Sequence, residues 1–168
     1  MSKLNKLLVL IFLLLAGYVC FYMGQHKKME KEGSAVFKSS LESVHSIHIA
    51  VNGKPKISLF KRNGRWRMVA PVEDVADENK IEKLLAYAQK IEKERVVGLN
   101  VLNFSPFGLS PPEAILTLET PAGLQELYFG HKTIDEKKVF ACLGGSKEIF
   151  LLMNEAEEQL LLQPFQLR

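Results

Sequence analysis

The chain has 168 residues, of which 47% are hydrophobic and 24% are charged, and its formal net charge is +3. This length accommodates one ordinary domain and a short additional segment. The small net charge excludes a general electrostatic attraction to nucleic acid, so we expect no nucleic-acid partner. The two cysteines, Cys20 and Cys142, lie far apart in hydrophobic surroundings, and we expect no disulfide between them.

An unbroken apolar run extends from Leu7 to Met23 and follows two basic residues, Lys3 and Lys6. As a helix this run would cover roughly 25 Å, slightly less than the ~30 Å hydrocarbon core of a bilayer. Signal-peptide cleavage requires small residues at a spacing of two, but Tyr22 occupies the first of these positions before Gly24. We therefore favour an uncleaved, single-pass membrane anchor over a cleaved signal peptide or a buried core helix.

The anchor divides the chain into three expected parts. Residues 1–24 form a cytoplasmic tail and transmembrane anchor, residues 25–43 a polar tether without a core, and residues 44–168 a soluble domain. The numbers of basic residues on the two sides of the anchor are nearly equal, so they do not decide its orientation. The N-terminal tail is too short to be a functional domain, and we therefore place the tail in the cytoplasm. We expect the domain on the periplasmic or extracellular side of the inner (cytoplasmic) membrane.

Apolar residues alternate with polar ones from Val44 onward, which predicts a half-buried strand. A second strand is expected at residues 57–62. A two-residue turn at Asn52-Gly53 would place apolar side chains opposite polar ones, whereas a three-residue loop keeps one face apolar. We predict the longer loop, which pairs Ile49 with Ile57 and Ile47 with Leu59.

A third strand is predicted at residues 65–70. The connecting Asn63-Gly64 tolerates positive φ and is typical of a type I′ hairpin turn, which fixes the register of the two strands. Trp66 is thereby placed on the apolar core face. The expected pairs are Lys61 with Trp66, Leu59 with Met68 and Ile57 with Ala70.

A helix is predicted after this hairpin, with Asp77 as its N-cap. Its apolar positions recur at helical spacing at Ile81, Leu84, Leu85, Ala88 and Ile91. A second series of strands is expected at residues 114–120, 124–129, 138–143 and 148–152. Asn154, with Glu157 three residues later, resembles a helix-capping arrangement and opens a short helix that extends through Leu162.

The predicted fold class is α+β, because antiparallel strand meanders and helices are segregated along the chain. Strands followed by a helix occur twice, which indicates a possible internal duplication with halves at residues 44–95 and 113–163.

The candidate catalytic and metal-binding residues do not form a constellation. His45 and His48 are three residues apart on a strand, point to opposite faces and cannot jointly hold one metal ion. His131 lies near turn carboxylates but has no nucleophile to activate, and Cys142 is expected to be a small apolar core residue. Gly144-Gly145 lacks the lysine and helix start of a phosphate loop and indicates a hairpin turn. We therefore assign no catalytic, cofactor-binding or metal-binding residues.

A candidate contact surface lies on the first meander, because every charge between Glu42 and Glu73 is basic. Anionic lipid headgroups or an acidic partner would suit this surface, and an ordinary solvated hairpin is the alternative. The candidate residues are Lys54, Lys56, Phe60, Arg62, Arg65 and Arg67.

Several short motifs recur in an order that resembles a known family. They are Trp66 with Pro71, the Ala76-Asp77 helix start, Phe107-Gly108-Leu109-Ser110-Pro111, Phe129-Gly130, and Ile149-Phe150-Leu151. Over roughly residues 44–168 the chain resembles a bacterial domain-of-unknown-function family often found beside gliding-motility-type auxiliary ABC exporter components. The resemblance implies an envelope protein near a transporter or secretion assembly, and it brings no established catalytic residues.

These observations lead to one expected function and two alternatives. We expect a membrane-tethered, non-catalytic interaction or scaffold module of a bacterial envelope complex, accessory to an ABC-type transporter. Its expected partners are the membrane through Leu7 to Met23, an envelope or transporter protein and possible anionic lipid, and no cofactor is implied. The alternatives are a lipid- or glycan-binding envelope domain and an envelope hydrolase.

Overall fold

The computed structural model describes residues 15, 35–37 and 40–168. Apart from Leu15, the predicted anchor at residues 7–23 lies outside these described residues. Within the described part of the chain, no helix is both long enough and apolar enough to cross a bilayer.

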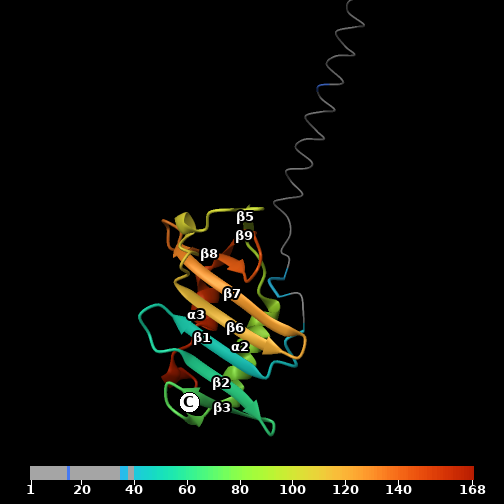
Figure 1. Ribbon diagram of the computed structural model, residues 1–168, viewed down its shortest axis with the longest axis vertical. Helices are drawn as coiled ribbons and strands as arrows, with labels where there is room; N and C mark the ends of the chain where they lie inside the picture. Colours follow the sequence, from blue (N-terminus) through green and yellow to red (C-terminus); the bar gives the residue numbers. More distant parts are fainter. Residues whose placement is uncertain (1–14, 16–34, 38–39) are drawn as a thin grey trace, which may run out of the picture. The chain divides into compact units, whose positions relative to one another are not determined.

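One antiparallel sheet organises the domain. In the described part of the chain it has nine strands in the order β4-β3-β2-β1-β6-β7-β8-β9-β5 (Figure 1). The strands are β1 (Ser46–Val51), β2 (Ile57–Arg62), β3 (Arg65–Ala70), β4 (Asp74–Val75), β5 (Arg95–Gly98), β6 (Ala114–Thr120), β7 (Gly123–Lys132), β8 (Lys138–Leu143) and β9 (Ile149–Met153). The helices are α2 (Glu78–Lys90) and α3 (Asn154–Leu160), and two 3₁₀ turns lie at Ser105–Phe107 and Pro164–Gln166.

The segregation of an antiparallel sheet from two helices confirms the α+β class. β1 lies between β2 and β6, so it joins the strands of the first meander to those of the second. Both helices lie on the same face of the sheet (Figure 1). We call this the core face and the opposite side the outer face. The short strands β4 and β5 were not predicted from the sequence, because neither is long enough to show a clear alternation.

The main core fills the space between the sheet and the helices. α2 contributes Ile81, Leu84 and Ala88 at the helical spacing expected from the sequence. Alternating apolar residues of the strands, such as Ile47 and Leu59, face these helix residues. Together they form one continuous cluster. The tether was expected to contribute no core, and this expectation is wrong for part of it, because its apolar residues pack into the same cluster. These buried tether residues are Val36, Phe37 and Leu41.

The observed register confirms the predicted pairs, since Ile47 lies opposite Leu59 and Ile49 opposite Ile57. The connection between β1 and β2 covers residues 52–56 and is therefore longer than the predicted three-residue loop. In the β2–β3 hairpin, the turn residues Asn63 and Gly64 have φ values of 52° and 78°, as a type I′ turn requires. The predicted pairs of Lys61 with Trp66 and of Leu59 with Met68 are confirmed. The predicted pair of Ile57 with Ala70 is wrong. An irregularity between Ser58 and Leu59 shifts the ladder, so that Ala70 lies opposite Ser58.

The two helix starts differ from each other. Asp77 is the N-cap of α2, and its carboxylate accepts hydrogen bonds from the backbone N–H groups of Asn79 and Lys80 at 3.0 and 3.3 Å. The capping role predicted for Asn154 is wrong, because Met153 occupies the N-cap of α3 without a side-chain cap bond. Asn154 is already helical, and its backbone N–H donates to the carbonyl oxygen of Lys137 at 2.9 Å. α3 also ends two residues earlier than predicted, at Leu160.

A second, smaller core covers part of the outer face. Buried residues Leu109, Cys142 and Ile149 meet there, with Phe107 and Phe140 packed against them. The rings of Phe107 and Phe140 form an edge-to-face pair with centroids 5.2 Å apart. The segment that follows β5 therefore shields the outer face over β8 and β9. The outer face over β2 and β3 instead presents exposed arginines.

Candidate functional site

The β2–β3 hairpin directs a set of basic side chains to the outer face. Phe60 lies opposite Arg67 in the ladder, and Arg62 lies opposite Arg65. Side chains alternate between the two faces of a strand, and Leu59, Trp66 and Met68, on the other face of β2 and β3, are buried in the main core. The four residues of these two pairs therefore share the solvent side of the hairpin.

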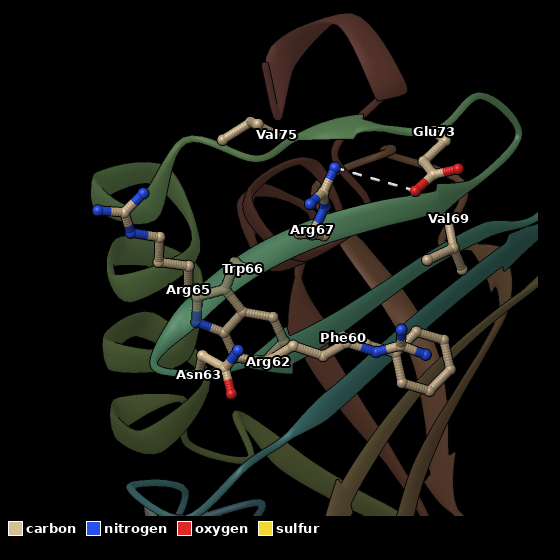
Figure 2. A pocket seen from close by; sticks show the side chains of 9 residues that line it. All are labelled: Phe60, Arg62, Asn63, Arg65, Trp66, Arg67, Val69, Glu73 and Val75. Atoms are coloured by element: carbon tan, nitrogen blue, oxygen red, sulfur yellow. Dashed lines mark ion pairs between the residues drawn. The ribbon is translucent and has the colours of Figure 1, made fainter.

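A groove of about 590 Å³ lies at this hairpin and reaches β4 (Figure 2). We call it the arginine groove. Its lining combines three guanidinium groups, one carboxylate, one amide and an apolar wall. The lining residues are Phe60, Arg62, Asn63, Arg65, Trp66, Arg67, Val69, Glu73 and Val75.

The charges of the arginine groove are unevenly paired. Arg67 Nη2 lies 3.9 Å from Glu73 Oε1, and both side chains are more than half exposed, at 52% and 74%. Such an exposed pair contributes little stability. Among the described residues, no carboxylate lies within ion-pair distance of Arg62 or Arg65. These two like charges lie directly opposite each other, an arrangement that is destabilising in an antiparallel ladder.

The apolar wall of the groove comes from β2, β3 and β4. The side chain of Phe60 is partly buried, while Val69 and Val75 are 43% and 63% exposed. Trp66 also contributes to the lining, but the residue is only 3% exposed and belongs to the main core. The groove thus presents positive charge beside exposed aliphatic surface.

The candidate contact surface from the sequence is only partly gathered here. Phe60, Arg62, Arg65 and Arg67 all line the arginine groove. Lys54 and Lys56 do not, because they lie in the connection between β1 and β2, at the far end of the β2 strand from the Asn63-Gly64 turn.

The groove also includes residues that were absent from the candidate contact surface, namely Asn63, Trp66, Val69, Glu73 and Val75. Glu73 and Val75 reach the site because the two-residue strand β4 pairs with Arg67 and Met68. Two residues are too few to display an alternation. The presence of Pro71 signalled only that the third strand would end.

A hydrogen-bonded histidine lies beside Phe60 on the outer face. The two ring nitrogens of His48 are each 2.9 Å from a serine hydroxyl, Nε2 from Ser46 and Nδ1 from Ser58. The His48 and Phe60 rings meet edge to face, with centroids 5.4 Å apart. Burial lowers the pKa of His48, and the positive charge of Lys56 lowers it further. The imidazole of His48 thus packs against the Phe60 wall of the groove and is held there by the two serine hydroxyls.

The other candidate residues are engaged in separate places. His45 Nε2 lies 3.8 Å from a carboxylate oxygen of Glu119, and His131 Nε2 lies 3.5 Å from one of Glu113. Within the described residues, no group of three histidine, cysteine or acidic side chains is arranged to hold a metal ion.

Cys142 and the glycine pair match their sequence interpretation. Cys142 is buried in the second core, where burial raises the pKa of its thiol to about 11. Gly144 and Gly145 form the turn between β8 and β9, and Gly145 has a φ of 73°.

Comparison with known proteins places the chain in a family without a described activity. No curated protein matches it, and no solved structure matches it. A family model described as "Domain of unknown function (DUF4340)" matches residues 66–168, which is more than half of the chain. The match begins within β3 and includes every described strand after it and both helices. The chain therefore belongs to the DUF4340 family.

Proposed function

We propose that this protein is a membrane-tethered, non-catalytic interaction module of a bacterial envelope complex, accessory to an ABC-type transporter. The apolar run from Leu7 to Met23 supports the tether and an inner-membrane location. The resemblance of the sequence motifs to a family found beside auxiliary ABC exporter components supports the transporter setting.

The arginine groove is the observation that carries this proposal. It is concave, it lies on the solvent side of the sheet and its charged groups leave two positive charges in excess. Its lining contains no serine, cysteine, histidine or lysine, and its one carboxylate, Glu73, is paired with Arg67. The groove therefore offers recognition through charge and shape, and its partner carries negative charge.

A lipid- or glycan-binding envelope domain is the second candidate function. The specific observation in its favour is the exposed aliphatic surface of Val69 and Val75 beside the arginines, to which Val72, 53% exposed, adds. A basic surface next to exposed apolar side chains suits an amphiphilic ligand at a membrane interface.

Co-purification from membranes tests the proposed function. The full chain carries Arg62→Glu with Arg65→Glu, and the control carries Lys54→Glu with Lys56→Glu, which makes the same change in charge outside the groove. We expect the arginine variant to lose the ATPase and permease of an ABC-type transporter, while the lysine variant retains them. Equal recovery of the ATPase and permease with the wild type and both variants would contradict the proposal.

A further inference from the structure

We infer that the arginine groove binds a phosphate monoester group. This inference rests on the proposed function, because it takes the groove as the recognition site and names the anionic group that enters it.

The charge of the groove matches a dianion. Arg62, Arg65 and Arg67 supply three positive charges, and Glu73 supplies one negative charge. Glu73 is paired with Arg67, so the excess lies at Arg62 and Arg65. Above pH 7 a phosphate monoester approaches two negative charges, because its second pKa is about 6.

The register places the two arginines with excess charge opposite each other at the hairpin end, although their side chains extend in different directions in Figure 2. Arg62 and Arg65 flank the Asn63-Gly64 turn and are direct cross-strand partners, so their Cβ atoms are about 5 Å apart. Mutual repulsion makes this arrangement unfavourable without a counter-ion. A bound anion between the guanidinium groups would convert the repulsion into shared attraction.

Geometry distinguishes phosphate from carboxylate at this position. A carboxylate has two oxygen atoms, which one guanidinium group can engage with two parallel hydrogen bonds. A phosphate has a third oxygen and a larger charge, so it can accept hydrogen bonds from two or three arginine forks at once. A cluster of three arginines with one built-in carboxylate therefore suits phosphate better than a second carboxylate.

The organic group esterified to the phosphate would contact the apolar wall formed by Phe60, Val69 and Val75. Figure 2 shows Phe60 and Val69 on one side of the arginines and Val75 on the adjoining strand. A glycerol, sugar or acyl portion would pack there. A soluble phosphate monoester and a lipid that ends in a phosphate monoester, such as phosphatidic acid, share this chemistry, and the experiment must separate these two sources.

Titration calorimetry of the full chain provides the test. The protein is kept at pH 8 in a maltoside detergent, which carries no phosphate. The probes are inorganic phosphate, glycerol 3-phosphate, dihexanoyl phosphatidic acid below its micellar concentration, and acetate. The variants are Arg62→Gln with Arg65→Gln, the matched control Lys54→Gln with Lys56→Gln, and Arg65→Lys alone.

We expect one phosphate per chain and weaker binding of acetate. The arginine double variant should bind phosphate at least about tenfold more weakly, whereas the lysine control should change by less than about twofold. Arg65→Lys keeps the charge but loses the planar fork, so it should also bind more weakly than the wild type. Native tryptophan emission from every variant establishes that each remains folded.

The probes identify the source and the outcomes that overturn the inference. Tighter binding of glycerol 3-phosphate than of the lipid indicates a soluble ester, and the reverse order indicates a headgroup. The inference fails if the wild type does not bind phosphate, if acetate binds equally well, or if the lysine control loses as much affinity. If phosphate binds while the arginine variant still recovers the transporter, the proposed function fails and the phosphate site stands.

Discussion

Lys61 Nζ lies 5.9 Å from the centroid of the Trp66 ring, across the β2–β3 ladder. Trp66 is almost fully buried, and Lys61 extends over the indole while its ammonium group remains near solvent. This pair covers the main core at the end of the sheet near the Asn63-Gly64 turn. On the opposite face, the same strands carry the arginines, so the positions of the groove residues depend on the packing of Trp66.

Replacing Trp66 with alanine should strongly destabilise the domain. Truncation of a buried aromatic side chain costs about 3 to 5 kcal/mol of the free energy of unfolding, out of about 5 to 15 kcal/mol for a typical domain. Urea unfolding should show this loss, and the wild-type emission should be blue and resistant to iodide quenching. Red, readily quenched emission with a stable Trp66→Ala domain would show that the indole is exposed.

The turn between β2 and β3 should connect stability with ligand binding. Gly64 has a φ of +78°, and open space surrounds the position of an added Cβ, so Gly64→Ala suffers backbone strain without a clash. The expected cost is about 1 kcal/mol. Gly53→Ala, at φ +73° in similarly open space, is a matched control for stability.

Only the Gly64 change should affect the arginine groove, because Gly64 lies between Arg62 and Arg65. We expect similar thermal destabilisation of the two glycine variants but weaker phosphate binding only for Gly64→Ala. Equal effects on binding would indicate that the turn does not position the arginines.

Loss of the α2 N-cap should weaken the domain moderately. Asp77 accepts two backbone hydrogen bonds, and replacing a capping residue with alanine costs about 0.5 to 2 kcal/mol. Asp77→Asn should retain most of this stability because asparagine is also a good N-cap. Chemical denaturation of the two variants distinguishes capping from a simple effect of charge, which would destabilise them equally.

The thiol of Cys142 should react slowly in the folded protein. Burial raises its pKa from 9.0 to about 11, so few thiolates exist at pH 8. The raised pKa also means that this group's contribution to stability is fully present below pH 9 and declines as pH rises toward about 11. In a Cys20→Ser background, iodoacetamide should label Cys142 rapidly only after denaturation. Rapid labelling of the native protein would contradict its burial.

Local patterns in the sequence were sufficient for much of the first meander. Alternation and the Asn63-Gly64 turn together determined which residues of β2 and β3 face the core, and therefore which face carries the arginines. The error at Ile57 arose because an irregularity in a ladder depends on the surrounding tertiary structure and leaves no clear pattern in the sequence.

Long-range features were beyond sequence reasoning. The second half of the groove comes from Glu73 and Val75, which are placed by tertiary pairing of β4 with β3. Likewise, Val36 and Phe37 lie in a segment whose overall composition is polar, although their own side chains are buried. Composition averaged over a segment cannot reveal that a few of its apolar residues dock on a distant core.

The central position of β1 has a consequence for the folding of the nascent chain. Ser46 in β1 pairs with Glu119 in β6, 73 residues later. At a synthesis rate of about 5 to 20 residues per second, the interval between these two residues is about 4 to 15 s. Throughout that interval one edge of β1 has no partner strand from its own chain, and its exposed hydrogen-bonding groups invite pairing with other chains. The order of strands in the finished sheet thus sets how long the newly made first meander remains open to association with other chains.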